Sequence, residues 1–300
     1  MTFSEGGNFE GGRVQRGGGG GRIGGRGIAI GGGGLGAVII AIIYLAMGGN
    51  PADVLGGGTT TGGAGTGQEQ AVGACTAEQA NTDQECRLSA TAQALDAYWA
   101  EALPEQAGIE YVQPGVVSFT DAVDTGCGSA TSDTGPFYCP ADQTVYEDVR
   151  FYEVLSEQLG ASGGPLGEMY VTAHEFGHHI ENQLGWFEQA DRSGTGAESD
   201  SVRIELAADC LAGMWAGHAA TTEDPDTGVP FLRPPTKQEL NDALSAAEAV
   251  GDDRIQQRAG QQVDPHSFSH GTSEQRVDWF TRGYEGGTIE QCNALEAANL

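Results

Sequence analysis

Apolar residues recur at helical spacing through most of the chain beyond residue 77. The pattern begins near Ala77 and includes Leu88, Leu95 and Trp99. The same period predicts a helix after Asp148 and others over 166–184, 199–219 and 272–284. Gly185 suits the C-cap of the helix over 166–184. A further helix is predicted to begin at 235–236, because Glu239 follows Thr236 at the offset of a capping box.

Alternating apolar and polar positions predict a small sheet ahead of the main helices. Residues 111–119 alternate like one strand, and 135–138 and 143–146 resemble a strand pair that turns at 140–142. Strands come first along the chain and helices dominate later, which is the order of an α+β protein. We therefore predict an α+β domain, mostly helical with a small sheet.

An uncharged stretch over 27–47 is predicted to form one N-terminal transmembrane helix. Its 21 residues, at about 1.5 Å each, are long enough for a bilayer core of roughly 30 Å. Four arginines precede the stretch, at positions 13, 16, 22 and 26. The positive-inside rule then places the N-terminus in the cytoplasm and residues after 48 outside it. A cleaved signal peptide is the competing interpretation, but the stretch is long and no clear A-x-A site follows it.

Composition divides the chain into four parts. We expect a Gly/Arg-rich cytoplasmic tail over 1–26, the transmembrane helix over 27–47, a Gly/Thr-rich linker over 48–70 and one folded domain over 71–300. This arrangement describes a single-pass protein of the cell membrane whose domain is extracytoplasmic.

Charge is strongly negative and unevenly distributed. The net charge is −28, from 14 basic and 42 acidic residues. Residues before 48 carry four arginines against two glutamates, so the remainder carries 10 − 40 = −30. So acidic a body repels phosphate backbones, which excludes nucleic acid as an expected partner. The six cysteines contain no CxxC pair, so disulfides are expected rather than a cysteine zinc cluster.

The segment His174-Glu175-Phe176-Gly177-His178 is an HExxH motif on a predicted helix. Residues four apart face the same way, so His174 and His178 can bind one zinc ion. Glu175 lies one position round the helix, where its carboxylate can take a proton from zinc-bound water. A helix with two surface histidines is the simpler alternative, but it leaves Glu175 without a role.

A catalytic zinc needs a third protein ligand and an open position. The long HExxHxxGxxH form is absent, because Glu181 and Leu184 occupy the positions of its glycine and third histidine. Glu205 and Asp209 lie one turn apart on a later, largely apolar helix. Glu205 can bind the metal while Asp209 accepts a hydrogen bond from the outer nitrogen of a ligand histidine. A solvated acidic face is the alternative, although acids in apolar company usually have a partner.

Four blocks in this order resemble the neutral zinc metallopeptidase family of bacteria, which are single-pass membrane proteins with a Gly-rich N-terminal region. The blocks are GPFYCPADQTVYED (135–148), HEFGHHIENQLG (174–185), RIELAADCLAGMWAG (203–217) and HGTSEQRVDWFTRGYEGG (270–287). The resemblance covers about 75–300 and implies a zincin-like fold, zinc at His174, His178 and Glu205, and catalysis by Glu175.

Six cysteines allow 15 disulfide connectivities, so spacing alone does not select one. Local proximity together with the family resemblance favours Cys75–Cys86, Cys127–Cys139 and Cys210–Cys292.

The expected reaction is hydrolysis of a peptide bond in a peptide or protein substrate. His270 is a candidate to stabilise the oxyanion, and 136–139 is a candidate edge strand for binding an extended peptide. A non-catalytic, zinc-stabilised scaffold domain facing the cell envelope is the alternative function, and hydrolysis of a non-peptide amide is a third. Glu175 argues against the scaffold, because a structural zinc site does not need it.

Overall fold

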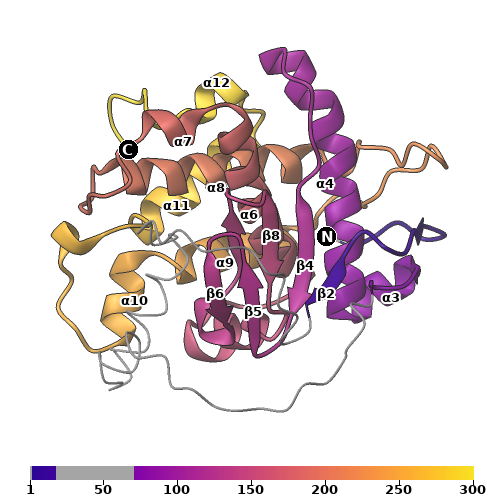
Figure 1. Cartoon of the computed structure of the whole chain (residues 1–300), viewed down its shortest axis with the longest axis horizontal. Helices are drawn as coiled ribbons and strands as arrows, with labels where there is room; N and C mark the ends of the chain where they lie inside the picture. The colour runs from indigo at the N-terminus through magenta and orange to yellow at the C-terminus, as the bar shows by residue number, and fades with distance from the viewer. Residues whose placement is uncertain (1, 18–70) are drawn as a thin grey trace.

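The computed structural model describes residues 2–17 and 71–300 and is α+β, mostly helical with small sheets. Figure 1 shows the labelled strands in the middle and lower part of the view, with the helices of the second half of the chain above them and to the left. The longer helices are α4 (Gln84–Ala107), α6 (Pro165–Gln183), α8 (Asp200–His218), α9 (Lys237–Ala249) and α11 (Ser273–Tyr284). The shorter ones are α3 (Ala77–Thr82), α5 (Phe151–Glu153), the π-helix η2 (Val154–Gln158), α7 (Trp186–Gln189), α10 (Asp252–Arg258) and α12 (Ile289–Cys292).

Strands of distant parts of the chain form one mixed sheet in the order β2-β4-β8-β7. Its members are β2 (Gln15–Gly17), β4 (Gly115–Phe119), β8 (Thr144–Glu147) and β7 (Phe137–Cys139). The first three are parallel, and β7 pairs antiparallel with β8. Two smaller pairs are β1 (Asn8–Phe9) with β3 (Cys75–Thr76), and β5 (Ala122–Thr125) with β6 (Gly128–Thr131).

Most predicted elements are present, and the helix caps have the expected chemistry. Thr236 and Glu239 form the capping box of α9. The C-cap of α6 is Leu184, and Gly185 follows it in the left-handed conformation (φ 72°), one residue later than expected. The predicted strand over 111–119 is shorter, because only 115–119 pairs with neighbours. The helix expected after Asp148 is limited to α5 and η2. Helix α10 and the β5–β6 hairpin were not predicted.

The division of the N-terminal region needs one correction. We expected 1–26 to form a tail separate from the domain, but residues 2–17 contribute β1 and β2 and bury Phe3, Phe9 and Val14. Composition concealed this because glycine-rich sequence surrounds only a few apolar anchors. The expected transmembrane helix over 27–47 and linker over 48–70 lie outside the described residues. Among the residues that are described, no helix is both long and apolar enough to cross a membrane.

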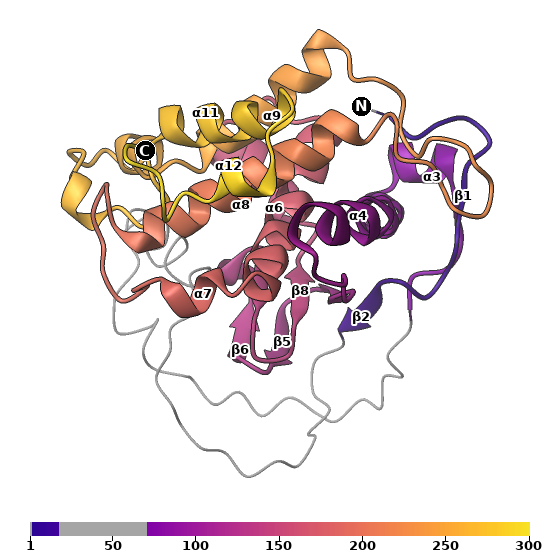
Figure 2. The ribbon, with the colours of Figure 1, turned by 90° about the horizontal axis from the view of Figure 1, so that it is seen from above.

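Small residues allow the central helices to approach closely. A Cβ added to Gly213 of α8 would lie 2.0 Å from the carbonyl oxygen of Phe280, and one added to Gly283 of α11 would lie 1.9 Å from that of Cys210. Both distances are far below van der Waals contact, so these positions require glycine. Figure 2 shows α8, α9 and α11 on one side of α6 and strands β5, β6 and β8 on the other. Helix α6 is therefore the buried centre of the domain.

Three disulfides join the cysteine pairs that local proximity and the family resemblance favoured. They are Cys75–Cys86, Cys127–Cys139 and Cys210–Cys292. The third links α8 to α12 across 82 residues and attaches the C-terminal segment to the helix that carries Glu205.

Removal of the Cys210–Cys292 disulfide is expected to lower both stability and zinc affinity. Closing a loop of 82 residues contributes roughly 4 kcal/mol in the chain-entropy model, equivalent to a fall of roughly 10 °C in Tm. Zinc affinity should fall as well, because Cys210 lies five residues after Glu205 on α8. The paired Cys→Ala variant is compared with one lacking Cys75–Cys86, by thermal melting and zinc titration. Equal zinc affinities in the two variants would refute the link to the site.

Candidate metal centre

Helix α6 places both histidines of HExxH on one buried face. Pro165 begins the helix at its first turn, and residues from Leu166 to Glu181 are largely buried. His174 and His178 are each 7% exposed, and their ring centroids lie 4.7 Å apart. The four-residue spacing of the motif thus has the geometric effect that the sequence predicted.

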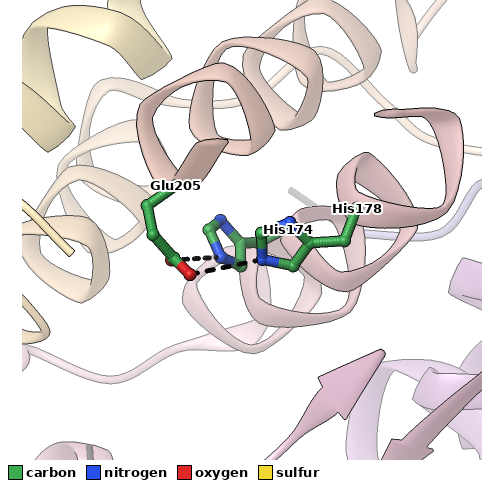
Figure 3. Close-up of side chains that lie close together, drawn as sticks. All are labelled: His174, His178 and Glu205. Atoms are coloured by element: carbon green, nitrogen blue, oxygen red, sulfur yellow. Dashed lines mark hydrogen bonds and ion pairs between the residues drawn. The ribbon is translucent and has the colours of Figure 1, made fainter. Parts of the chain in front are cut away.

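Helix α8 supplies the third group. A Cβ added to Gly177 would lie 2.8 Å from the carbonyl oxygen of Ala208, so the glycine within HExxH lets α6 and α8 approach closely. Glu205 then reaches across the contact toward both histidines, as Figure 3 shows. Its carboxylate oxygens lie 3.2 Å from Nε2 of His174 and 3.6 Å from Nε2 of His178. One donor atom from each residue falls within 4.8 Å of the others.

The outer nitrogens of both histidines are held by carboxyl groups. Nδ1 of His174 lies 2.9 Å from Oδ1 of Asp209, and Nδ1 of His178 lies 2.7 Å from Oε2 of Glu181. These bonds favour the tautomers in which Nδ1 donates and Nε2 keeps its lone pair. Two nitrogen lone pairs and a carboxylate then converge in a buried space. These electron-rich groups repel one another unless a cation lies between them. The donor set of two imidazoles and one carboxylate fits zinc.

A proton can substitute for the metal at His174. Burial acts to lower the pKa of His174, but the charge and hydrogen bond of Asp209 and the hydrogen bond of Glu205 raise it to about 9. For His178, burial prevails and lowers the pKa to about 3. Burial acts to raise the pKa of Glu205, yet His270, His178 and His174 together hold it far below its usual value. Metal binding at neutral pH must therefore displace the proton of His174.

Asp209 is fixed by a buried network from α11 and α6. Arg276 donates from Nε to Oδ2 at 2.7 Å and from Nη2 to Oδ1 at 3.0 Å, and Tyr170 donates its hydroxyl to Oδ1 at 2.5 Å. Burial opposes ionisation of Asp209, but Arg276 and His174 outweigh it and lower the pKa. Arg276 also lies 3.8 Å from Glu205, so one buried cation balances the two carboxylates of α8.

Glu175 lies beside the three-residue group without joining it. It is 7% exposed, and burial, opposed by His174 and reinforced by Glu205, raises its pKa to about 7. The backbone of Tyr138 in β7 hydrogen-bonds to it. His179 and Asn182 of α6 hold the Tyr138 hydroxyl at 3.0 Å each, so β7 is anchored to the helix that carries the motif. His179 is thus a packing residue.

Glu181 is a site residue that the sequence alone did not indicate. We noted it only as a replacement for the glycine of the longer motif, yet it follows His178 by three residues and so shares its face of α6. Burial, reinforced by Glu205, raises the pKa of Glu181 well above its usual range. Oε2 of Glu181 can accept the hydrogen bond from Nδ1 of His178 in either protonation state of Glu181. In the neutral acid, Oε2 is then the carbonyl oxygen.

Loss of the acceptor at Glu181 is expected to weaken zinc binding. Glu181→Leu should reduce zinc affinity by about 10- to 100-fold, the usual effect of losing a group that orients a ligand histidine. Glu181→Gln retains a carbonyl acceptor and should stay much closer to the unaltered protein. Competition with a fluorescent chelator measures both affinities. A Glu181→Leu variant that binds zinc as well as the parent would show that His178 needs no orienting partner.

His270 lies next to the site in a loop held by Asp252. Oδ2 of Asp252 accepts the backbone N–H groups of Ser269, His270 and Gly271, while Oδ1 lies 3.2 Å from Nδ1 of His270. The ring is 1% exposed, and its Nε2 has no hydrogen-bond partner among the described residues. After burial, the largest effect on the pKa of Glu205 comes from the neighbouring His270, which lowers that pKa.

Glu147 is a second buried carboxyl that sequence analysis did not single out. It ends β8 facing α6, is fully buried, and accepts hydrogen bonds from the hydroxyls of Tyr152 and Thr172. Burial is the main cause that raises its pKa to about 8, with a contribution from Glu175. The folded protein therefore retains this proton at neutral pH.

Glu147 should make stability fall as pH rises. Below pH 4.5, the ordinary pKa of a glutamate, both the folded and the unfolded chain hold the proton of Glu147. Between pH 4.5 and about pH 8 only the unfolded chain releases it, so the free energy of unfolding falls as pH rises through this range. Glu147→Gln removes this titration and keeps the acceptor. Its Tm should match the parent at pH 5 and exceed it by roughly 5–10 °C at pH 8. Tm is measured by calorimetry at both pH values. The same Tm difference between the two proteins at pH 5 and at pH 8 would refute the assignment.

A family comparison agrees with this geometry. Residues 2–295 match the family described as "Putative neutral zinc metallopeptidase". Because the match covers nearly the whole chain, the protein belongs to this family. The family match includes residues 2–17, which the structure places in the same folded body as the site.

Similar proteins occur in Mycobacterium and in Escherichia coli. The chain is 46% identical over 225 residues, 75% of each chain, to the uncharacterized protein Rv2575 of Mycobacterium tuberculosis and to Mb2605 of Mycobacterium bovis. It is 45% identical over 197 residues, 64% of each chain, to the uncharacterized protein YpfJ of Escherichia coli K12. No solved structure matches the chain significantly.

Proposed function

We propose that this protein hydrolyses peptide bonds in peptides or proteins, using zinc held by His174, His178 and Glu205. The observation that carries the proposal is the buried convergence of these three donors beside a carboxyl group that is not one of them. A structural site has no use for Glu175 in that place, whereas hydrolysis by an activated water requires a base there. Membership of the family supports the same reaction.

Zinc held by these residues would polarise the scissile carbonyl and lower the pKa of the attacking water. Glu175 is placed to accept a proton from the attacking water and to return it to the leaving amine, a route that needs no covalent intermediate. Asp209 and Glu181 keep the two imidazoles oriented, and Arg276 keeps Asp209 ionised.

Strand β7 is the proposed platform for the substrate. It is the edge strand next to α6 in the four-stranded sheet, and its Tyr138 backbone contacts Glu175. An extended peptide that adds to this edge would bring its backbone alongside the general base. His270 is the proposed oxyanion donor, supported by its unpartnered Nε2 and its influence on Glu205. A mixed sheet with an antiparallel edge beside the HExxH helix supports a zincin-like fold.

The proposed location of 71–300 is outside the cytoplasm. Three disulfides support it, since such bonds persist in oxidising compartments. We further propose that the chain attaches to a membrane through 27–47, a stretch without charged residues.

The test is peptide-library cleavage by the full chain, analysed by mass spectrometry. Zinc-loaded protein should yield cleaved peptides, and a chelator should abolish them until zinc is returned. A zinc-binding protein that cleaves no peptide or casein would support the scaffold function instead. Cleavage limited to non-peptide amides would change the substrate class and leave the metal chemistry intact.

A further inference from the structure

Residues 2–17 pack as part of the folded domain. Phe3 and Phe9 are 0% and 3% exposed and meet edge to face, and Phe9 also stacks on Phe231 from the segment before α9. The backbone joins this contact, since Ser4 donates to the carbonyl of Phe231 and Arg233 donates to that of Thr2. The contacts with Phe231 and Arg233 connect residues more than 200 positions apart in the chain.

Two arginines of this segment form ion pairs with α4. Arg13 donates to both oxygens of Asp96 at 2.5 and 3.1 Å, and its guanidinium carbon lies 5.9 Å from the ring centre of Phe176 within HExxH. Arg16 pairs with Glu85 at 2.5 Å. Half of the four arginines that suggested a cytoplasmic N-terminus therefore have partners in the folded domain.

The segment also pairs with the chain that returns at residue 71. Gly12 donates to the carbonyl of Val72 at 2.9 Å, and Val72 donates to that of Val14 at 2.8 Å. Gln15 faces Ala71 in an antiparallel bridge, and 8–9 pair with 75–76. In Figures 1 and 2 the indigo N-terminal segment lies beside the purple elements that follow residue 71. Residues 8–15 and 71–76 thus lie side by side as two antiparallel strands, which we call the stem.

We infer that residues 2–17 and 71–300 lie on the same side of any membrane. A single crossing would separate the two strands of the stem by a bilayer core of roughly 30 Å. It would break the pairing of β2 with β4 and expose Phe3, Phe9 and Val14. The inference replaces the expected cytoplasmic N-terminus and does not depend on the proposed enzymatic activity.

Cysteine labelling of the full chain in cells tests this inference. Asn8→Cys places a thiol at an exposed position of β1, and Val229→Cys places one on the other part of the domain, where the side chain is 42% exposed. All six native cysteines are in disulfides, so they give no background. A membrane-impermeant maleimide is applied before and after permeabilisation, with a cytoplasmic thiol protein as the leak control. Glu10→Cys, also exposed, replaces Asn8→Cys if that variant does not accumulate.

The two thiols should give the same labelled fraction, a ratio of about 1, in both conditions, because two positions on the same side of a membrane are equally accessible to the reagent. Labelling of both in intact cells supports the inference together with the extracytoplasmic location. Labelling of both only after permeabilisation supports the inference and contradicts that location. Labelling of Val229→Cys in intact cells with Asn8→Cys protected would overturn the inference.

Discussion

Glu175→Gln should keep zinc bound and lose at least about 1000-fold in kcat/KM, toward the upper end of what a general base contributes. The side chain keeps its size and its place beside Tyr138, but it can no longer accept a proton. Since Glu175 is not among the three converging donors, zinc stoichiometry should remain that of the unaltered protein.

Glu147→Gln is the matched control for this experiment. It also replaces a buried carboxyl facing α6 by an amide, but it lies outside the group of donors. Its kcat/KM should stay within about tenfold of the parent, because it takes part in no proton transfer to the substrate. Equal losses in the two variants would indicate damage to α6 rather than removal of a base.

Glu205→Ala should abolish tight zinc binding. Loss of a direct ligand should exceed the loss of about 10- to 100-fold typical of orienting groups, and we expect at least about 1000-fold in affinity. Arg276, 3.8 Å from the missing carboxylate, adds repulsion because it would face the metal with only Asp209 as counter-charge.

The control for Glu205→Ala is Glu198→Ala. Glu198 precedes α8 and its side chain is 69% exposed, so its removal changes net charge equally without touching the site. Zinc affinity of both variants is measured against a chelator of known strength. Unchanged affinity in Glu205→Ala would show that the third ligand is a different residue.

The local part of the site could be predicted from sequence, since helical geometry fixes it. His174, Glu175 and His178 need only a helix, and the capping boxes and Gly185 indicated where the helices begin and end. Glu205 and Asp209 could also be proposed from the sequence, because acidic residues on an apolar helix need partners. Glu181 shows the limit, because comparison with a longer motif obscured a simple i, i+3 neighbour of His178.

Long-range pairing was not predictable in the same way. Strand β2 is Gln15-Arg16-Gly17, which has no apolar alternation, and it exists only because β4 offers a parallel partner. The anchors Phe3 and Phe9 owe their burial to residues such as Phe231, far along the chain. The glycine-rich composition of the N-terminal region therefore gave no sign that it belongs to the fold.

The most direct test of the central claim is a titration of hydrolysis against bound zinc. A peptide found in the library assay is incubated with metal-free full chain to which zinc is returned in steps. The account predicts a rate that rises in proportion to zinc, levels off at about one ion per chain, and stays near zero throughout for Glu175→Gln. Hydrolysis without zinc, or a Glu175→Gln variant as active as the parent, would contradict it.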